Sequence, residues 1–452
     1  MEHDFDLIVV GLGVGGEELA GRCAEAGLNV LAIERKLVGG ECPYWGCIPS
    51  KMMVRSANAL AETKRLPQLA GTAQVERDYA PVVARINEAT GGWDDTVAVE
   101  RLEKKGATFR RGGARFVAPD ALEVEGERYR ARRGIVIATG GAPSVPPIDG
   151  LEDVDFWTNR EAIEATAPPA SMIVLGAGAI GLEIAQAWRR FGTEVTIVEI
   201  SDQVLPGEEP ENAGAMADVL KQDGMRLRLG AEAERVKGTN AGVAVELGDG
   251  GIVEAERLLV ATGRRLTLGR LGVEAAGLDP EARAIDVDEH LRAGEGLWAI
   301  GDVTGKGAFT HNAMYQAHIA VADILERPHE PADYRAVPRV TFTDPEVGGV
   351  GLTESAAREA GIDVRTGVAT TSSSARGWIH GPGAEHGVAK LVADAERGIL
   401  VGASVMGPSA GDVIGLLVLA IKESVPVDAL RELIYPYPTF VRGLEDALRE
   451  LA

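Results

Sequence analysis

Cysteine is scarce in this sequence, with three residues in a chain of 452. This scarcity excludes a small scaffold stapled by disulfides and favours a protein of a reducing compartment. Two of the three, Cys42 and Cys47, nevertheless lie five positions apart in GGECPYWGCIPSK (39–51). The pair is a structural disulfide, part of a metal site or a redox-active pair, and the rest of the chain must distinguish these possibilities.

Basic residues and long apolar runs are also scarce. Lys and Arg number 46 against 68 Asp and Glu, giving a net charge of −22, so nucleic acid and anionic membrane surfaces are poor partners. The longest apolar run, VIGLLVLAI (413–421), is far shorter than the ~20 residues of a membrane span and predicts a buried helix. The N-terminal MEHDFDLIVVG lacks the basic segment that opens a signal peptide. We therefore expect a cytoplasmic protein with no membrane partner.

Glycine is abundant, with 57 residues, and part of it forms a pattern. An apolar strand leads into Gly11-x-Gly13-x-x-Gly16, a helix, and a second strand that ends at Glu34. In such a unit the first glycine allows a tight turn, the second lets a pyrophosphate approach the backbone, and the third lets the helix pack on the strand. The helix N-terminus attracts phosphates, and the terminal acid can bind ribose hydroxyls. The pattern predicts a dinucleotide-binding unit.

The same pattern occurs a second time. Gly176-x-Gly178-x-x-Gly181 stands between a strand and a helix, and the next strand ends at Glu199. In both copies 23 positions separate the first glycine from the terminal acid. Two units predict two dinucleotides, whose simplest joint chemistry is hydride transfer from a nicotinamide to a flavin. The alternative is one functional site beside one that has lost its function.

Three further segments extend this organisation. LWAIGDV (297–303) predicts a buried strand that ends at Gly301-Asp302, where the acid can bind a ribityl or phosphate-linked hydroxyl. RRGIVIATGGAP (132–143) and RLLVATGRR (257–265) are matching strand-to-turn segments, one after each glycine pattern. The repeated organisation therefore includes these strand-to-turn segments as well as the two glycine patterns.

Taken together, these motifs resemble the pyridine nucleotide-disulfide oxidoreductases, the family of dihydrolipoamide dehydrogenase, glutathione reductase and mercuric reductase. The resemblance covers essentially the whole chain, including VTFTDPEVGGVGLTE (340–354). It implies an α/β fold with two Rossmann-like dinucleotide-binding domains and a C-terminal α+β dimerisation domain. The implied boundaries are 1–148 and 271–335 for the two parts of the FAD-binding domain, 149–270 for the NAD-binding domain and 336–452 for the dimerisation domain.

The resemblance also implies two sets of cofactor-binding residues. AFTH (308–311) resembles the loop whose backbone amides approach the flavin pyrimidine ring. The implied FAD-binding residues are Gly11, Gly13, Gly16, Glu34, Lys51, Gly140, Gly301, Asp302, Ala308, Phe309 and Thr310. The implied NAD-binding residues are Gly176, Gly178, Gly181, Glu199 and Gly263.

Glu199 distinguishes between the two nicotinamide cofactors. An acid at this strand end bonds a free ribose 2′-hydroxyl and repels a 2′-phosphate. The following ISDQ (200–203) contains no arginine, and Arg189 and Arg190 are expected on the solvated face of the preceding helix. The sequence therefore predicts NADH rather than NADPH.

The surroundings of Cys42 and Cys47 favour a redox pair. A metal site needs three or four ligands, and no histidine or third cysteine is nearby in sequence, so no metal is expected. A structural bridge over so short a loop would add little stability. Pro43 is expected to break the chain after Cys42, and a helix is expected to begin at Cys47, where its N-terminus favours a thiolate. Lys51 would lie one turn further along the same face.

The resemblance assigns roles to these residues. It implies that Cys47 contacts the flavin and that Cys42 exchanges with the substrate. Lys51 is implied to lie beside the flavin, with Glu183 as its ion-pair partner. Cys23, by contrast, is expected to be a small buried apolar residue on the first helix.

Tyr44 and Trp45 stand where related reductases carry a smaller pair. They are interpreted either as extra packing above the flavin or as an aromatic surface that stacks on a flat acceptor. The packing interpretation is favoured.

The C-terminal segment LIYPYPTFVRGLEDAL (433–448) departs further from the family. The family's His-Pro-x-x-x-Glu segment handles the protons of disulfide exchange, but here Tyr437 takes the place of the histidine and Arg442 that of the glutamate. Tyr435 replaces a second common histidine. Tyrosine, with a pKa near 10, is a poor base at neutral pH. The usual acid–base pair is therefore missing.

Other groups are candidates for the missing proton transfer. Glu445 can share a helical face with Arg442. His380 and His386 lie in GWIHGPGAEHG (377–387), which is expected to be a solvent-exposed loop. No cysteine follows Cys47, which excludes a C-terminal thiol relay.

The sequence thus predicts a homodimeric FAD-dependent NADH oxidoreductase with a redox-active disulfide. Its acceptor is a small disulfide with an easily expelled thiolate, or a quinone, and efficient dihydrolipoamide oxidation is not expected. The alternatives are an NADH:quinone-type reductase with direct transfer from the flavin and a non-catalytic thiol redox sensor. The predicted catalytic residues are Cys42, Cys47, Lys51, Glu183 and Tyr437.

Overall fold

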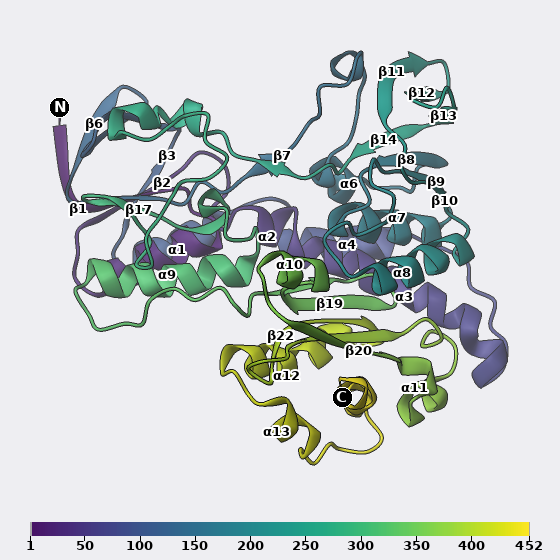
Figure 1. Ribbon diagram of the computed structural model, residues 1–452. Helices are drawn as coiled ribbons and strands as arrows, with labels where there is room; N and C mark the ends of the chain where they lie inside the picture. Colours follow the sequence, from purple (N-terminus) through teal and green to yellow (C-terminus); the bar gives the residue numbers. More distant parts are fainter. Residues whose placement is uncertain (1, 452) are drawn as a thin grey trace. The chain divides into compact units, whose positions relative to one another are not determined.

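The computed structural model describes residues 2–451, which divide into two compact units (Figure 1). Unit 1 comprises the segments up to residue 49, 85–143 and 264–334. Unit 2 comprises 50–84, 144–263 and the segment from 335 onward. Each unit therefore collects segments that are distant in sequence.

An eight-stranded sheet forms the centre of unit 1. Its strands follow the order β16-β17-β6-β1-β2-β3, with β4 and β5 attached to β6, and the pairs around β1 are parallel. Parallel strands covered on both faces have continuous apolar sequences, and the residues of VLAIE are accordingly buried as far as the final glutamate. The strands are β1 (Glu2–Val10), β2 (Val30–Glu34), β3 (Thr108–Arg111), β4 (Ala114–Ala118), β5 (Ala121–Val124), β6 (Glu127–Ile137), β16 (Arg292–Gly294) and β17 (Leu297–Ala299).

Helices α1 and α9 pack side by side in unit 1 (Figure 1). One face of α1, with Leu19, Ala20 and Cys23, is fully buried in a core shared with α9. The helices of this unit are α1 (Val14–Glu25), α2 (Glu41–Tyr44), α5 (Thr96–Lys104) and α9 (Thr310–Ile324). Two helices contain residues of both units, α3 (Cys47–Leu69) and α4 (Ala80–Thr90).

Unit 2 repeats the strand–helix–strand arrangement that begins unit 1. Strand β8, helix α7 and strand β9 correspond to β1, α1 and β2, and the sheet order β10-β9-β8-β14 is entirely parallel. Its elements are β8 (Ser171–Leu175), β9 (Glu194–Val198), β10 (Arg226–Arg228), β14 (Arg257–Val260), α6 (Asn159–Glu164), α7 (Ala179–Phe191) and α8 (Pro210–Gln222). An antiparallel sheet follows, β11 (Ala233–Thr239), β12 (Gly242–Leu247) and β13 (Ile252–Ala255).

The C-terminal part of unit 2 is an antiparallel five-stranded sheet packed against α12 and α14. The predicted helix at 413–421 lies within α12, and most of its apolar residues are buried. The strands, in the order β18-β19-β22-β21-β20, are β18 (Pro338–Thr341), β19 (Glu346–Gly351), β22 (Ile399–Gly407), β21 (Val388–Asp394) and β20 (Val364–Thr370). The helices are α10 (Glu354–Glu359), α11 (Ala375–His380), α12 (Ala410–Lys422), α13 (Val427–Arg431) and α14 (Leu444–Glu450). Within residues 2–451, every helix is too short or too polar to cross a bilayer.

Three local expectations were wrong. Pro43 does not break the chain but lies in the short helix α2. The amides in the first turn of a helix have no helical acceptor, so the amide hydrogen that proline lacks is not needed there. Arg190 is not on a solvated face: it is 3% exposed and pairs with Asp223 and Asp344. His380 is the last residue of α11 rather than part of a loop.

The burial of Cys23 leads to a first prediction. Cys23 is fully buried, and burial raises the pKa of its thiol to about 12 against the opposing effect of Arg327 and Arg133. Because burial also makes Cys23 inaccessible, a small cysteine-directed reagent should modify only Cys42 and Cys47, which are half-buried and exposed, in the native reduced protein, as counted by mass spectrometry, and Cys23 only after unfolding. The Cys23→Ala variant should give the same native count, and modification of Cys23 in folded protein would contradict the packing described here.

Candidate active site

The first glycine turn has the close contacts that its pattern requires. Gly11 has a φ of +92°, and a Cβ there would lie 2.5 Å from the carbonyl oxygen of Ala138. A Cβ at Gly16 would overlap the carbonyl oxygen of Gly11, whereas a Cβ at Gly13 would meet no atom within 4 Å. The first and third glycines are thus required by the fold, and the open position at the second leaves room for a ligand.

The second turn reproduces these contacts in unit 2. Gly176 has a φ of +101°, a Cβ at Gly181 would overlap the carbonyl oxygen of Gly176, and a Cβ at Gly178 would meet nothing within 4 Å. Gly263 also has a positive φ, and its carbonyl accepts a hydrogen bond from the Ser144 amide. Both turns fit a dinucleotide pyrophosphate lying against the backbone at a helix N-terminus.

A carboxylate at the end of the second strand holds each turn. Glu34 accepts hydrogen bonds from the amides of Leu12 (2.9 Å) and Lys36 (2.7 Å). Glu199 accepts hydrogen bonds from the amides of Ala177 (2.7 Å) and Ser201 (2.9 Å). In both cases the amide of the residue after the first glycine of the turn, Leu12 or Ala177, donates one of these hydrogen bonds. The sequence indicated ribose contacts for these acids but not this second task of fixing the turn.

The Gly301-Asp302 turn lies beside the strand-to-turn segment that contains Gly140. Arg264 connects them, because its Nε lies 3.1 Å from an Asp302 carboxylate oxygen and its Nη2 donates to the carbonyl of Gly141 at 2.6 Å. The amide of Gly301 donates to the side chain of Gln316 on α9 at 2.6 Å. Sequence reasoning missed both Arg264 and Gln316. The two consecutive arginines after the second ATG, Arg264 and Arg265, could have indicated a role for Arg264. No pattern in the sequence indicated Gln316.

The two cysteines lie at the beginnings of helices. Cys42 is in α2, and Cys47 is the first residue of α3, as predicted. The Cys47 Sγ lies 3.4 Å from the hydroxyl of Thr310, which is the first residue of α9. The two sulfurs are not joined in a disulfide, and Cys47 is exposed whereas Cys42 is half-buried. The positive ends of two helices thus adjoin Cys47, and helix N-termini favour a thiolate.

The two sulfurs differ in how firmly they hold a proton. A hydrogen bond to Cys47 and then burial raise the pKa of the Cys42 thiol well above its ordinary value, although Thr310 lowers it. Cys42 therefore retains its proton and can donate it toward Cys47. The contact of Thr310 with the sulfurs was not predicted, because this residue was implied only as a flavin neighbour.

The loop before α9 brings aromatic rings to its first turn. Ala308 and Phe309 precede the helix, and the Phe309 ring stacks on that of His311 with centroids 5.2 Å apart and an interplanar angle of 10°. This stack fixes the loop next to Thr310. The backbone there lies directly at the positive end of α9.

Lys51 and Glu183 form an ion pair in unit 2. The Lys51 Nζ lies 2.6 Å from Glu183 Oε2, and the Phe342 amide donates to Oε1 at 2.8 Å. The ammonium also lies 4.8 Å from the centroid of the Phe342 ring. Glu183 is 4% exposed, so its charge is removed from water and compensated by these partners. Phe342, from the 340–354 motif, thus orients both members of the pair.

Tyr44 and Trp45 differ in exposure. Tyr44 is 5% exposed, consistent with the packing interpretation, whereas Trp45 is half-buried with its ring centroid 5.9 Å from that of Tyr44. Only Trp45 therefore offers an accessible aromatic surface.

The C-terminal segment has no acid–base pair at the expected positions. Tyr437 is 69% exposed, and the Arg442 guanidinium lies 5.5 Å from its ring centroid. Arg442 pairs with Glu445 at 2.9 Å, so this carboxylate is engaged with a cation. Tyr435 is structural, since its hydroxyl donates to the carbonyl of Leu430.

The two histidines proposed as substitutes are engaged elsewhere. The His380 ring packs against Phe440, with centroids 5.5 Å apart. The His386 Nε2 lies 3.1 Å from the side-chain oxygen of Gln222. Neither contact orients an imidazole with a carboxylate, which is the arrangement that disulfide exchange uses for a general base.

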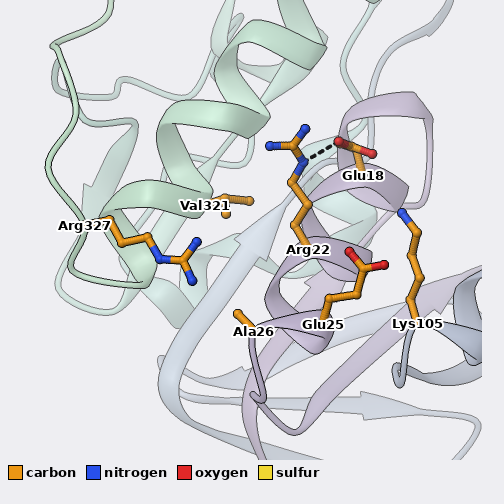
Figure 2. A pocket seen from close by; sticks show the side chains of 7 residues that line it. All are labelled: Glu18, Arg22, Glu25, Ala26, Lys105, Val321 and Arg327. Atoms are coloured by element: carbon orange, nitrogen blue, oxygen red, sulfur yellow. Dashed lines mark hydrogen bonds and ion pairs between the residues drawn. The ribbon is translucent and has the colours of Figure 1, made fainter.

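A surface hollow of about 480 Å³ is lined by residues of α1 and α9 and of the segments that follow them, together with Lys105 (Figure 2). Its cations and acids alternate, and Figure 2 shows Arg22 paired with Glu18. This mixture of charges favours neither an anion nor a cation, so the hollow has no evident chemistry. Its lining residues are Glu18, Arg22, Glu25, Ala26, Lys105, Val321 and Arg327.

Comparisons with known proteins agree with this geometry. Residues 5–317 match the model of the pyridine nucleotide-disulphide oxidoreductases, and residues 337–448 match the dimerisation domain of the same family. The chain is 36% identical to a dihydrolipoyl dehydrogenase of Thermus scotoductus, over 99% of this chain and 97% of that protein. It is 34% identical to a mercuric reductase of Bacillus cereus, over 99% of this chain and 71% of that protein.

A solved structure shows the same similarity in three dimensions. The Cu(II) complex of the HOCl-induced flavoprotein disulfide reductase RclA from Escherichia coli superimposes with a TM-score of 0.87. The sequences are 27% identical, and the match covers 99% of both chains. The α/β fold and its C-terminal domain are therefore shared along the full chain.

The glycine contacts predict a difference between two alanine variants. Gly181→Ala should lower the free energy of unfolding by about 1–3 kcal/mol, because the new methyl overlaps a backbone carbonyl. Gly178→Ala should change stability by less than about 0.5 kcal/mol, yet weaken binding of the nicotinamide cofactor by about tenfold or more, roughly 1.4 kcal/mol. Thermal unfolding and cofactor titration measure the two effects. Equal unfolding temperatures for the two variants would contradict this account.

Proposed function

The chain belongs to the pyridine nucleotide-disulphide oxidoreductase family, and from this membership we propose that it passes electrons from NADH through FAD and the Cys42–Cys47 pair to a disulfide-type acceptor. Members of this family are FAD-dependent oxidoreductases. The observation that best supports the proposal is the contact of Cys47, at the N-terminus of α3, with Thr310, at the N-terminus of α9.

FAD is proposed to bind at the first glycine turn. Gly13 leaves room for the pyrophosphate, and Glu34 is held in place for the ribose by the amides it binds. Asp302 pairs with Arg264 at 3.1 Å, and its carboxylate oxygens are proposed to accept hydroxyl hydrogen bonds. When bound, the flavin accepts hydride from the nicotinamide and supplies two electrons to the disulfide. The remaining proposed FAD-binding residues are Gly11, Gly16, Lys51, Gly140, Gly301, Ala308, Phe309 and Thr310.

NADH is proposed to bind at the second turn, formed by Gly176, Gly178 and Gly181, together with Gly263 of the second ATG segment. Glu199 is 8% exposed and accepts hydrogen bonds from the amides of Ala177 and Ser201, and a carboxylate there disfavours a 2′-phosphate. Arg190 cannot compensate, because it is buried against Asp223 and Asp344.

The proposed thiol chemistry balances as two consecutive exchanges. Reduction of the Cys42–Cys47 disulfide by two electrons and one proton gives the Cys47 thiolate and the Cys42 thiol, which holds its proton through its contact with Cys47. Transfer of that proton to Cys47 frees Cys42 to attack the acceptor disulfide, whose distal sulfur leaves as a thiolate. Cys47 then loses the proton to solvent and attacks the Cys42 sulfur of the mixed disulfide, so that the second acceptor sulfur leaves as a thiolate and the Cys42–Cys47 bond forms again.

The C-terminal segment restricts the acceptor. Tyr437, the proposed catalytic residue of this segment, can donate a proton or hydrogen bond but is a poor base at neutral pH. With Arg442 in place of the orienting acid, a leaving thiolate receives little help. Acceptors whose thiolates have low pKa values leave without such help. We therefore propose an activated disulfide rather than lipoamide, with a quinone as the second candidate because Trp45 offers an accessible aromatic surface.

The active form is proposed to be a homodimer. Residues 337–448 form the family's dimerisation domain, and Tyr437 and the neighbouring Ile434 are 69% and 95% exposed in the single chain. An apolar side chain this exposed is typical of a surface covered by a partner. We keep as part of this proposal the boundaries expected from the sequence, 1–148 and 271–335 for the FAD-binding domain and 149–270 for the NAD-binding domain.

Cofactor preference is the first test of this proposal. NADH should reduce the bound flavin faster than NADPH at equal concentration, measured by stopped-flow absorbance under anaerobic conditions. Glu199→Ala should reduce this preference, because the repulsion of the 2′-phosphate is removed. Glu194, an exposed acid on the same strand, supplies the matched control Glu194→Ala, which should keep the preference. Faster reduction by NADPH in the unmodified protein would show that the role of Glu199 is wrong.

The acceptor is tested with the cysteine variants. NADH-dependent turnover should be fastest with an aromatic disulfide and should be lost in Cys42→Ser, which retains FAD, whereas Cys23→Ser should keep it. Turnover of dihydrolipoamide should be about 10²–10⁴-fold below that of an enzyme with the usual dyad, and Tyr437→His combined with Arg442→Glu should recover part of it.

The other outcomes distinguish the alternatives. Turnover restricted to quinones and unchanged in Cys42→Ser would show direct transfer from the flavin. Absence of turnover with every acceptor, despite reduction of the flavin by NADH, would support the redox sensor.

A further inference from the structure

We propose that His290, Asp323 and His329 bind one divalent transition-metal ion of the zinc class in unit 1. His290 precedes β16, Asp323 lies in the last turn of α9, and His329 is in the loop that follows. One ligand atom from each side chain can be chosen so that all three lie within 4.8 Å of one another. The site is separate from the cysteine motif, and the proposal does not depend on the function proposed above.

His329 has the tautomer that a metal ligand requires. Its Nδ1 lies 3.0 Å from the backbone carbonyl oxygen of Glu330. A carbonyl only accepts, so Nδ1 carries the hydrogen and donates it. This arrangement leaves Nε2 with a lone pair and orients the ring, as a carbonyl commonly does for metal-binding histidines.

Asp323 is ionised and fixed in direction. Arg292 contacts both carboxylate oxygens, and the Trp298 indole donates to Oδ2 at 2.8 Å. Although burial opposes ionisation, the hydrogen bonds from Arg292 and Trp298 hold the pKa of Asp323 below its usual value. Metal-binding carboxylates are typically held by such outer hydrogen bonds. Oδ1 is the oxygen directed toward His329.

The distance between the two ligand atoms favours a metal over a direct contact. The His329 Nε2 lies 3.6 Å from Asp323 Oδ1. That is longer than a charge-assisted hydrogen bond, about 2.7–2.9 Å. Two ligands at about 2.1 Å from a tetrahedral ion are roughly 3.4 Å apart. The observed separation is close to the second value.

His290 supplies the third group. Its ring lies perpendicular to that of His329, with centroids 5.0 Å apart. Its Nδ1 is buried and has no hydrogen-bond partner among residues 2–451, although a third of the side chain is exposed. A buried polar atom without a partner costs free energy. A metal ion bound to Nδ1 would remove this cost, and the Glu289 carboxylate, 3.8 Å from Nε2, lies on the ring's other side.

Two imidazoles and one carboxylate define the kind of ion. Imidazole suits zinc, copper, iron and nickel, whereas calcium and magnesium prefer oxygen ligands only. Three protein ligands leave a further position for water, as in open zinc sites. The ion would tie together the loop before β16, the end of α9 and the loop after it, so its expected role is to stabilise unit 1.

Zinc binding is tested in the FAD-containing protein with Cys42→Ser and Cys47→Ser, so that the reactive thiols cannot ligate the ion. Calorimetry should show one Zn²⁺ per chain, and the unfolding temperature should rise with Zn²⁺ concentration and fall again with a chelator. His329→Gln and His290→Gln should each weaken binding by at least about tenfold. His318→Gln, an exposed histidine of α9 that lies 3.8 Å from Glu18, should bind as tightly as the parent.

Co²⁺ gives a direct measure of the ligands. Its visible absorption should be that of a site with nitrogen and oxygen ligands, without sulfur-to-metal bands, and should disappear in His329→Gln. If one histidine variant fails to fold, as judged by circular dichroism and FAD content, the other still tests the site. Absence of Zn²⁺ binding once the thiols are removed, or binding unchanged in both histidine variants, would overturn the proposal.

Discussion

One interaction recurs at the centre of each dinucleotide-binding region: a glutamate at the end of the second strand accepts a hydrogen bond from the amide in the middle of the glycine turn. Glu34 binds Leu12 in this way, and Glu199 binds Ala177. The turn is only possible because Gly16 and Gly181 let the helix backbone touch the preceding carbonyl. Strand, turn, helix and acid therefore depend on one another. The same arrangement that fixes the fold also orients the amides that face the cofactor phosphates.

Much of this could be predicted from sequence because the constraints are local. A glycine with a positive φ, a helix that begins at Cys47 and an apolar strand that ends in an acid are each determined by a short stretch of sequence. Arg190 shows where local reasoning fails. Its neighbours in sequence indicated a solvated helix face, but Asp223 and Asp344, distant in the chain, take it into the interior. Tertiary partners override a helix pattern when they satisfy a buried charge.

Contacts between distant segments were likewise out of reach. Thr310 is 263 positions from Cys47, and nothing in the short motif around either residue indicates that they meet. The histidines and aspartate of the proposed zinc site are spread from 290 to 329, far from the close spacing typical of structural zinc motifs. The sequence led to the expectation that no metal is bound, because only the cysteine motif was considered. The loop before β16, the end of α9 and the loop after it bring these ligands together, and loop geometry is the part of a fold least determined by local sequence.

The C-terminal segment keeps its place in the fold but lacks the proton-transfer residues of its family. Its position after α13 and its contact with the C-terminal core are retained, as the hydrogen bond from Tyr435 to Leu430 shows. The family's proton-transfer groups are not retained. In their place, Arg442 forms an ion pair with Glu445 and packs over the ring of Tyr437. Under the proposed function, the proton for exchange comes from within the cysteine pair, where Cys42 holds it against Cys47. This proton serves the attack by the enzyme's own sulfurs, but it does not assist an alkyl thiolate that leaves the acceptor. The proposal therefore makes the leaving-group pKa of the acceptor, rather than a residue of the chain, the property that sets the rate of exchange.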